Sequence, residues 1–196
     1  MIQRLATISR NTKETQVSLD LNLDGTGISS IQTGIGFFDH MLDLFTHHGL
    51  FDLKVVMNGD LNIDGHHSVE DVGIALGTAF RQALGDARGI VRYASGLTPM
   101  DEALAQVAID VSNRPYLYFN CDLPKTTLGG FDVELTHEFF NAFVNNARIT
   151  LHIDVIRGTN LHHIIEACFK GFGRLLGQSV QINPRQSAVP STKGIL

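Results

Sequence analysis

Apolar and polar residues alternate in several short runs of the chain, which is the pattern of strands with one buried face. Residues 16–21 read QVSLDL and residues 106–111 read QVAIDV, so the two runs match at an offset of 90 residues. Residues 51–57 and 149–155 also carry apolar side chains at every second position. We expect these four runs to be strands at matching places in two halves of the chain.

Stretches with the apolar spacing of helices follow some of these runs. One stretch opens at residues 37–42 and another at residues 136–140. The string HHSVE at residues 66–70 matches HHIIE at residues 162–166 at an offset of 96, and each string opens a further helical stretch. The predicted order in each half is therefore strands, helix, strand, helix.

This repeat, which also places Gly77 on Gly173 at the offset of 96, predicts an α+β fold of two tandem duplicated half-domains. Each half is expected to be a mostly antiparallel sheet with its helices on one face, because amphipathic helices must cover an apolar sheet surface. Ser95, Gly96 and Pro99 are expected to break the helical pattern before the second copy. The predicted units are residues 1–94, residues 95–183 and a C-terminal tail at residues 184–196.

Composition excludes several classes of protein. The chain of 196 residues is 43% hydrophobic, enough for a substantial core, and its net charge of −5 argues against bulk binding of nucleic acid. Residues 1–16 lack the apolar core of a signal peptide, and no run of about 18 apolar residues predicts a membrane span. Cys121 and Cys168 form no CxxC pair and are expected to be reduced, as in the cytoplasm.

The histidine pairs carry the candidate chemistry. Residues four apart lie on one face of a helix, so His66 with Glu70, and His162 with Glu166, can each bind one ion. Neighbouring histidines point about 100° apart, so the two members of each pair are expected to serve different ions. Imidazole and carboxylate ligands suit manganese, iron or zinc, and no thiolate lies near these motifs to suggest a zinc finger. Manganese is the first choice.

Five motifs together resemble the imidazoleglycerol-phosphate dehydratase family. They are FDHML at residues 38–42, HHSVED at 66–71, PMDEALA at 99–105, RPY at 114–116 and PSTKG at 190–194. The resemblance covers nearly the whole chain and implies a duplicated fold of the ribosomal protein S5 domain 2-like kind. It implies a metal-dependent hydro-lyase that converts imidazole glycerol phosphate into imidazole acetol phosphate in histidine biosynthesis.

The resemblance also implies two Mn²⁺ ions per active site, in a homo-oligomer of 24 subunits with its sites at subunit interfaces. The implied metal ligands are His40, His66, His67, Glu70, Glu138, His162, His163 and Glu166. Members of the family often have Glu-His-Phe-Phe where this chain has His137-Glu138 before two phenylalanines, so Glu138 takes the usual histidine position and His137 is the alternative. The ligand types permit manganese, iron or cobalt.

The remaining site residues also follow from the resemblance. The implied phosphate-binding residues are Arg92, Arg114, Lys170, Ser191 and Lys193, a set of guanidinium, ammonium and hydroxyl groups suited to a dianion. His48 is expected beside the substrate imidazole, and the tail is expected to close over the phosphate. Glu14 corresponds to the catalytic glutamate.

The implied reaction removes a C2 proton that is not acidic in the substrate. An imidazolate held between metals can expel hydroxide from C3, after which a carboxylate such as Glu14 can take the C2 proton, and the enol becomes a ketone. Two other functions fit a repeated histidine–glutamate motif: a protein that binds metal only to assemble, and a phosphomonoester hydrolase. A di-iron carboxylate bundle is disfavoured, because it has Glu-x-x-His on four long helices.

Overall fold

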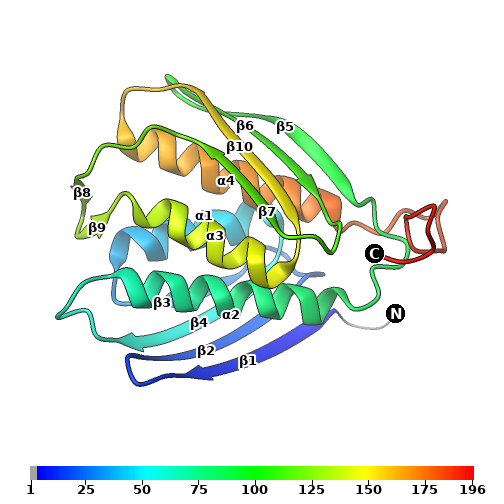
Figure 1. The fold of residues 1–196 in the computed structure, drawn as a ribbon, viewed down its shortest axis with the longest axis horizontal. Coiled ribbons are helices and arrows are strands. Elements are labelled where there is room, and N and C mark those ends of the chain that lie inside the picture. The colour runs from blue at the N-terminus through cyan, green and yellow to red at the C-terminus, as the bar shows by residue number, and fades with distance from the viewer. Residues whose placement is uncertain (1–3) are drawn as a thin grey trace.

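A computed structural model describes residues 4–196, in which two four-stranded sheets flank four helices (Figure 1). The first half comprises β1 (Leu5–Asn11), β2 (Thr15–Asn22), β3 (Ser29–Gln32), α1 (Gly36–Gly49), β4 (Asp52–Gly59) and α2 (His66–Leu84). The second half comprises β5 (Tyr93–Met100), β6 (Ala103–Asp110), β7 (Tyr116–Asn120), α3 (Leu135–Ala147), β10 (Thr150–Arg157) and α4 (Leu161–Ser179). A small hairpin of β8 (Thr127–Leu128) and β9 (Phe131–Asp132) precedes α3. The predicted order of elements is confirmed in both halves.

The two large sheets have the same topology. Their strand orders are β1-β2-β4-β3 and β5-β6-β10-β7. In each sheet only the last pair, β3 with β4 or β7 with β10, is parallel, and the other pairs are antiparallel. The expected mostly antiparallel sheets are therefore confirmed. Of the helices in residues 4–196, none is both long and apolar enough to cross a membrane.

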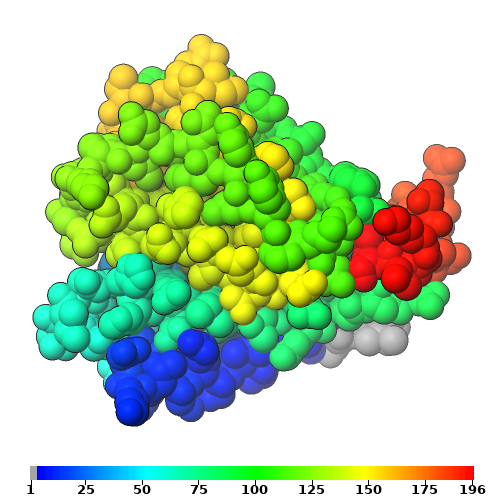
Figure 2. Space-filling view, viewed as in Figure 1, coloured from blue at the N-terminus to red at the C-terminus, as the bar shows by residue number. Residues whose placement is uncertain are grey.

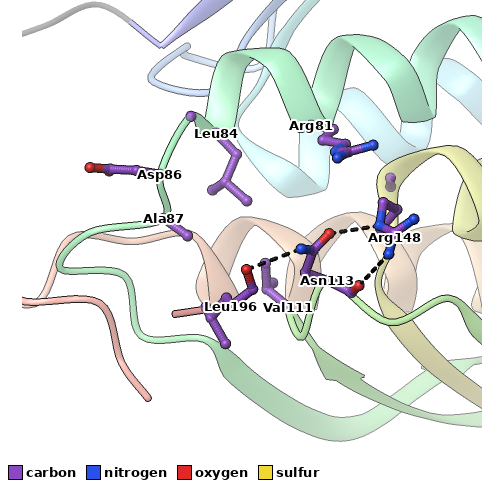
Figure 3. Close-up of a pocket in the computed structure, with 10 residues that line it drawn as sticks. Arg81, Leu84, Asp86, Ala87, Val111, Asn113, Arg148 and Leu196 are labelled. Carbon is purple, nitrogen blue, oxygen red and sulfur yellow. Dashed lines mark hydrogen bonds between the residues drawn. The ribbon is translucent and has the colours of Figure 1, made fainter. Parts of the chain in front are cut away.

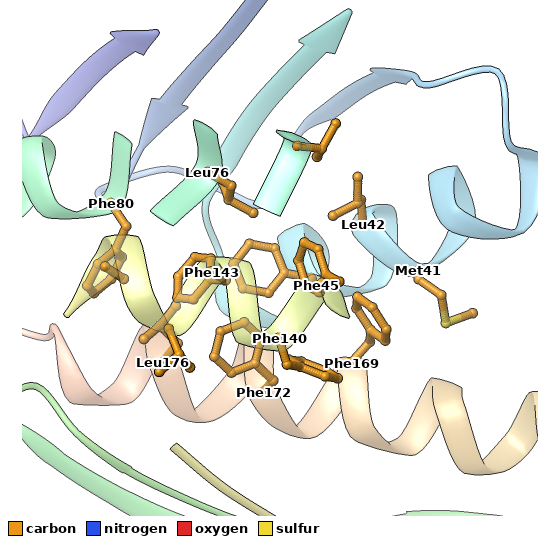
Figure 4. Packing of buried hydrophobic residues seen from close by; sticks show 14 of the residues in the cluster. Met41, Leu42, Phe45, Leu76, Phe80, Phe140, Phe143, Phe169, Phe172 and Leu176 are labelled. Atoms are coloured by element: carbon orange, nitrogen blue, oxygen red, sulfur yellow. The ribbon is translucent and has the colours of Figure 1, made fainter. Parts of the chain in front are cut away.

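The helices lie between the sheets and form the centre of the core (Figure 1). Helix α2 covers β1 and β2, α4 covers β5 and β6, and across the middle α1 packs on α4 while α2 packs on α3. Phenylalanines from three of the helices meet there, among them Phe45, Phe143 and Phe172 (Figure 4). The histidine-pair helix α4 is thus anchored by Phe169 and Phe172, whereas α2 contributes Phe80, which packs on Phe143.

Gly77 and Gly173, which the repeat places at matching positions, permit the close approach of these helices. A Cβ atom on Gly77 would lie 2.5 Å from the carbonyl oxygen of Phe143, and one on Gly173 would lie 2.3 Å from that of Phe45. Both distances are shorter than any real carbon–oxygen contact, so any larger residue would push the helices apart. The α2–α3 and α1–α4 contacts are therefore equivalent.

The sheets correct the predicted register of the first repeat. Val17, Leu19 and Leu21 pair with Met57, Val55 and Leu53, whereas Ala105, Val107 and Ile109 pair with Val155, Ile153 and Leu151. The hairpins fix the offset, because the pairs Leu5–Asn22 and Tyr93–Asp110 and the turns between them are related by 88 residues. Leu19 is therefore equivalent to Val107, and the predicted offset of 90 is wrong. Because side chains in a strand alternate with a period of two, a shift by two residues keeps every apolar side chain on the same face. The apolar pattern cannot distinguish the two registers.

Helices α1 and α3 match at an offset of 98. Phe38, Phe45 and Gly49 are buried, as are Thr136, Phe143 and Ala147, and each helix ends at a left-handed residue, Leu50 or Arg148. This register makes His40 equivalent to Glu138 and Asp39 equivalent to His137. The extra residues before α3 include the β8–β9 hairpin.

The junction between the halves differs from the expected break in a helix. Helix α2 already ends at Leu84, and β5 begins at Tyr93, so Ser95, Gly96 and Pro99 lie within a strand that pairs with β6. The division predicted after residue 94 falls inside this strand.

Candidate functional site

One cluster of potential metal ligands forms where α1 packs on α4. The Nε2 atom of His162 lies 3.0 Å from Oε2 of Glu166, and Nε2 of His40 lies 3.4 Å from the same oxygen. One donor atom from each of these three side chains lies within 4.8 Å of the others. Both histidines are partly exposed, whereas the Glu166 side chain is only 8% exposed. Two imidazoles therefore face a buried carboxylate at the protein surface.

Lys170 lies beside this cluster, one helical turn beyond Glu166. Its Nζ donates to Oε1 of Glu166 at 2.8 Å. Burial raises the pKa of Glu166, but hydrogen bonds from Lys170, His162 and His40 outweigh burial, so the pKa lies below its usual value. Burial and the charge of Lys170 lower the pKa of His48, which favours its neutral form. The cluster thus holds an ionised carboxylate among neutral or cationic nitrogen donors.

His163, the neighbour of His162, points to a different set of groups at the β5–β6 turn. Its Nδ1 lies 2.8 Å from Oε2 of Glu102. The other oxygen of Glu102 accepts the backbone N–H groups of Thr159 and Asn160 at 3.1 and 2.7 Å. The hydrogen bond from His163, followed by those from the backbone, lowers the pKa of Glu102 to about 2. The pKa of His163 is correspondingly raised by Glu102.

The equivalent turn of the first half carries Glu14, between β1 and β2. Glu14 borders a cavity of about 260 Å³ that is also lined by Asp60. Oδ2 of Asp60 lies 3.0 Å from Nδ1 of His67, and this hydrogen bond raises the pKa of His67, with a smaller contribution from the charge of Glu14. Within residues 4–196 the Glu14 carboxylate accepts no hydrogen bond. Glu14 and His67 are therefore brought together, with the carboxylate free.

The other predicted ligands do not converge within one chain. Among residues 4–196, His66, Glu70 and Glu138 form no group of three close donors like that of His40. His137 packs edge-on against Phe119, and its Nδ1 lies 3.4 Å from Oε1 of Glu138. The register of α1 and α3 nevertheless places Glu138, and not His137, at the position equivalent to His40.

Four of the five predicted phosphate-binding residues line a separate cavity of about 740 Å³. They are Arg92, Arg114, Ser191 and Lys193. The guanidinium group of Arg92 donates to Asp110 at 2.7 Å and to the carbonyl of Pro190 at 2.7 Å. The hydrogen bond with Asp110 raises the pKa of Arg92, which is charged in any case. Lys170 does not line this cavity and instead lies beside Glu166.

The C-terminal segment that carries Ser191 and Lys193 lies at one end of the molecule (Figure 2). Near its start the carbonyl of Ala188 accepts the N–H of Gly89 at 3.0 Å. At Leu196 the main-chain oxygen accepts from the Asn113 side chain at 3.0 Å, and Arg148 holds Asn113 by two further hydrogen bonds (Figure 3). The segment is thus fixed at both ends beside the cavity.

Sequence reasoning assigned no role to several residues that the structure places at these sites. Glu102 lies in the PMDEALA motif and Asp71 lies in the HHSVED motif. Their places in these motifs could have identified them as candidate site residues. Asp60 lies in a loop between β4 and α2, and Asn113 directly precedes Arg114. No spacing rule connects Asp60 to His67 or Asn113 to Leu196, because these contacts arise only on folding.

Comparison with known proteins identifies the family of the chain. A family model described as imidazoleglycerol-phosphate dehydratase matches residues 33–176. Relatives of that name from Trichlorobacter lovleyi and Geobacter sulfurreducens are 57% and 55% identical over 195 residues, and each alignment covers 100% of both chains.

Two solved structures of imidazoleglycerol-phosphate dehydratase have the same fold. The enzyme from Staphylococcus aureus is 44% identical, with a TM-score of 0.83 over 91% of this chain and 99% of its own. The enzyme from Pyrococcus furiosus, solved in complex with (S)-C348, is 35% identical, with a TM-score of 0.83 over 96% of this chain and 100% of its own. The chain belongs to the imidazoleglycerol-phosphate dehydratase family.

Proposed function

We propose that this chain dehydrates imidazoleglycerol phosphate to imidazole acetol phosphate in histidine biosynthesis, with two Mn²⁺ ions per site and Glu14 as the base. The observation that carries the proposal is the separation of two chemically different sites. The imidazole–carboxylate cluster of His40, His162 and Glu166 suits a metal, and the cavity with Arg92 and Arg114 suits a phosphate. The substrate has one end for each, an imidazole ring and a phosphate. Because the cluster lies at the start of α4 and Arg92 bonds to Ser179 at its end, the two sites would meet on one substrate only between different subunits.

The donor set fits a divalent ion of the Mn²⁺ class. His162 and His40 direct Nε2 atoms at the same oxygen of Glu166, so two imidazoles and one carboxylate face a common point. Nitrogen and oxygen donors without thiolate suit manganese, iron and cobalt. When bound, the ions would act as Lewis acids that stabilise the imidazolate form of the substrate ring.

A second ion would be held by the equivalent residues of the other half. Glu138 is equivalent to His40, and His66 and Glu70 are equivalent to His162 and Glu166. His67 and His163 point away from these positions toward Asp60 and Glu102. In our proposal they complete the coordination of ions held by neighbouring subunits, in an assembly of 24 with its sites at interfaces.

The chain's own residues would orient the substrate and move its proton. Arg92, Arg114, Ser191 and Lys193 would bind the phosphate dianion, with Lys170 added from elsewhere in the assembly. His48, held neutral by burial and by Lys170, would contact the imidazole ring. Glu14 would take the C2 proton, because Glu14 borders an open cavity and its carboxylate has no hydrogen-bond partner in residues 4–196.

We also propose a cytoplasmic location, since Cys168 is buried and both cysteines are unpaired thiols in the described chain.

The substitution Glu14→Gln tests the proposal, since it removes the base but no metal ligand. We expect kcat to fall by roughly 10²–10⁴-fold while manganese content and particle size stay unchanged. The matched control is Glu134→Gln, which changes an exposed glutamate outside both sites and should retain full activity. Assaying both imidazole acetol phosphate and inorganic phosphate separates dehydration from hydrolysis. Near-normal turnover by Glu14→Gln would exclude Glu14 as the base.

A further inference from the structure

An ion pair between a buried aspartate and a partly exposed arginine lies beside the turn that carries Glu14. Asp71, on α2, is 5% exposed. Its Oδ1 accepts from Nε of Arg10 on β1 at 2.8 Å and lies 2.8 Å from a second nitrogen of the same guanidinium. Its Oδ2 accepts from the hydroxyl of Thr15, at the start of β2. Asp71 therefore joins α2 to both strands of the hairpin.

Hydrogen bonds continue from this pair to Glu14 itself. Thr15 donates its only hydroxyl proton to Asp71, so the Thr12 hydroxyl, 3.2 Å away, donates to Thr15. The Thr12 oxygen is then free to accept the backbone N–H groups of Glu14 and Thr15, at 3.1 and 2.9 Å. An unbroken series of hydrogen bonds thus runs from Asp71 to the backbone of Glu14.

The second half lacks this network at the equivalent turn. At the offset of 88 the sheet pairing places Thr98 at the position of Arg10 and Ala103 at that of Thr15. At the offset of 96 the helices place Ala167 at the position of Asp71. Glu102, the equivalent of Glu14, is held instead through its own carboxylate by His163 and two backbone N–H groups. Among residues 4–196, the network of Arg10, Asp71, Thr15 and Thr12 thus has no counterpart in the second half, where Lys170 of the Glu166 pair contacts Met100 beside the turn.

Fixing a turn through its backbone leaves its carboxylate free to react. A partner on the carboxylate itself would hold Glu14 in place but would lower its basicity. A network that ends on the backbone N–H avoids that loss. Because Asp71 also follows Glu70 and lies one turn beyond His67 on α2, it ties the turn to the helix that carries predicted metal ligands.

From these contacts we propose that Asp71 is a positioning residue that sets the location of Glu14 relative to α2 through Thr15 and Thr12. The inference rests on the proposed role of Glu14 as the base. A displacement of about 1 Å at a reacting group can cost roughly 100-fold in rate. The substitution Asp71→Asn leaves Arg10 without its charged partner and should release the turn.

A double-mutant cycle with Glu14 distinguishes positioning from a general structural role. For Asp71→Asn we expect kcat to fall roughly 10–100-fold, KM to change by less than about 3-fold and manganese content to be unchanged. In a Glu14→Gln background the same substitution should change kcat by less than about 2-fold, because the base is already absent. An equal loss in both backgrounds would overturn the proposal. Near-normal turnover by Glu14→Gln alone would instead reject the proposed base.

A milder variant guards against a folding defect in Asp71→Asn. Thr12 is exposed, so Thr12→Val should fold normally while removing the acceptor for the Glu14 N–H. We expect a loss in kcat of several-fold that vanishes in the Glu14→Gln background, and recovery with Thr12→Ser. Thr7→Val, which removes an exposed hydroxyl that donates to Asp20 at 2.6 Å, away from the Glu14 turn, should leave kcat unchanged. Wild-type kcat for Thr12→Val would contradict the proposed series of contacts.

Discussion

His40 and Glu138 occupy equivalent positions on α1 and α3, although one is an imidazole and the other a carboxylate. His40 lies 3.4 Å from Glu166 in the ligand cluster, and the same burial pattern surrounds Glu138 on the opposite helix. The two metal sites of the proposed enzyme would therefore differ in one ligand.

The first prediction follows from that difference. We expect Glu138→Ala to reduce manganese content from two ions per subunit to about one, while Glu138→His retains both, because either side chain is a suitable ligand. His137→Ala should retain both ions, since its ring packs against Phe119. Metal analysis of the purified variants checks this. A loss of metal in His137→Ala and not in Glu138→Ala would reverse the assignment.

A second prediction concerns Glu102, which orients His163. A partner that fixes the ring of a metal-ligating histidine typically affects metal affinity by 10–100-fold. We expect Glu102→Ala to weaken manganese binding by about that factor, measured by titration of the metal-free protein. Asp86→Asn, an exposed acid that pairs with Arg88, is the matched control. Unchanged affinity in Glu102→Ala would show that His163 does not bind the metal or needs no support.

The third prediction tests the phosphate cavity. Arg114→Ala or Lys193→Ala should raise KM by roughly 10–100-fold, because each removes a charge-assisted hydrogen bond to a dianion. Arg88→Ala removes an exposed arginine paired only with Asp86 and should leave KM unchanged. Steady-state kinetics check all three variants. Normal KM values for both Arg114→Ala and Lys193→Ala would remove this cavity from the substrate site.

Metal and assembly are linked in the fourth prediction. If ions join helices of different subunits, chelation should shrink the particle, and manganese should restore both size and activity. His162→Ala and Glu166→Ala should mimic the chelated state, since they remove two of the three clustered donors. Light scattering before and after chelation measures the change. A metal-free protein of full size would break the link.

The fifth prediction concerns pH and the loop after β2. Hydrogen bonds from the backbone N–H groups of Thr26 and Ile28 lower the pKa of Asp52 below 3.8, against the opposing effect of burial. A carboxyl group whose pKa is lower in the folded state than in the unfolded state stabilises the fold at a pH above the unfolded-state pKa. This stabilisation is lost as the pH falls through the folded-state pKa. Asp52→Asn should therefore lower the urea midpoint at pH 7 by a small amount, because solvent screens an exposed carboxylate, and the difference should shrink between pH 5 and pH 3. A pH-independent difference would contradict this account.

Apolar periodicity was sufficient to predict the element order, since strands such as β4 and helices such as α4 each bury a regular face. Apolar periodicity could not fix the alignment of the two repeats, because a shift by two residues keeps the same side chains on the buried face of a strand. The equivalence of Leu19 with Val107 was missed for this reason. The HHIIE motif was sufficient to predict that His162 and Glu166 lie close together, because residues four apart lie on the same face of a helix. The partners Asp60 and Asn113 could not be predicted in this way, because their contacts join segments whose approach depends on packing.

The equivalence of Glu14 and Glu102 has an evolutionary consequence. In a symmetric dimer of half-length chains both turns would be encoded by one sequence, so any change to one would appear in the other. Joining the halves in a single chain allows each turn to change alone. Here the carboxylate of Glu102 is bonded to His163 and to the backbone, while Glu14 is held through its own backbone N–H and its carboxylate accepts no hydrogen bond in residues 4–196. The duplicated chain thus contains an asymmetry that two identical half-chains could not have evolved.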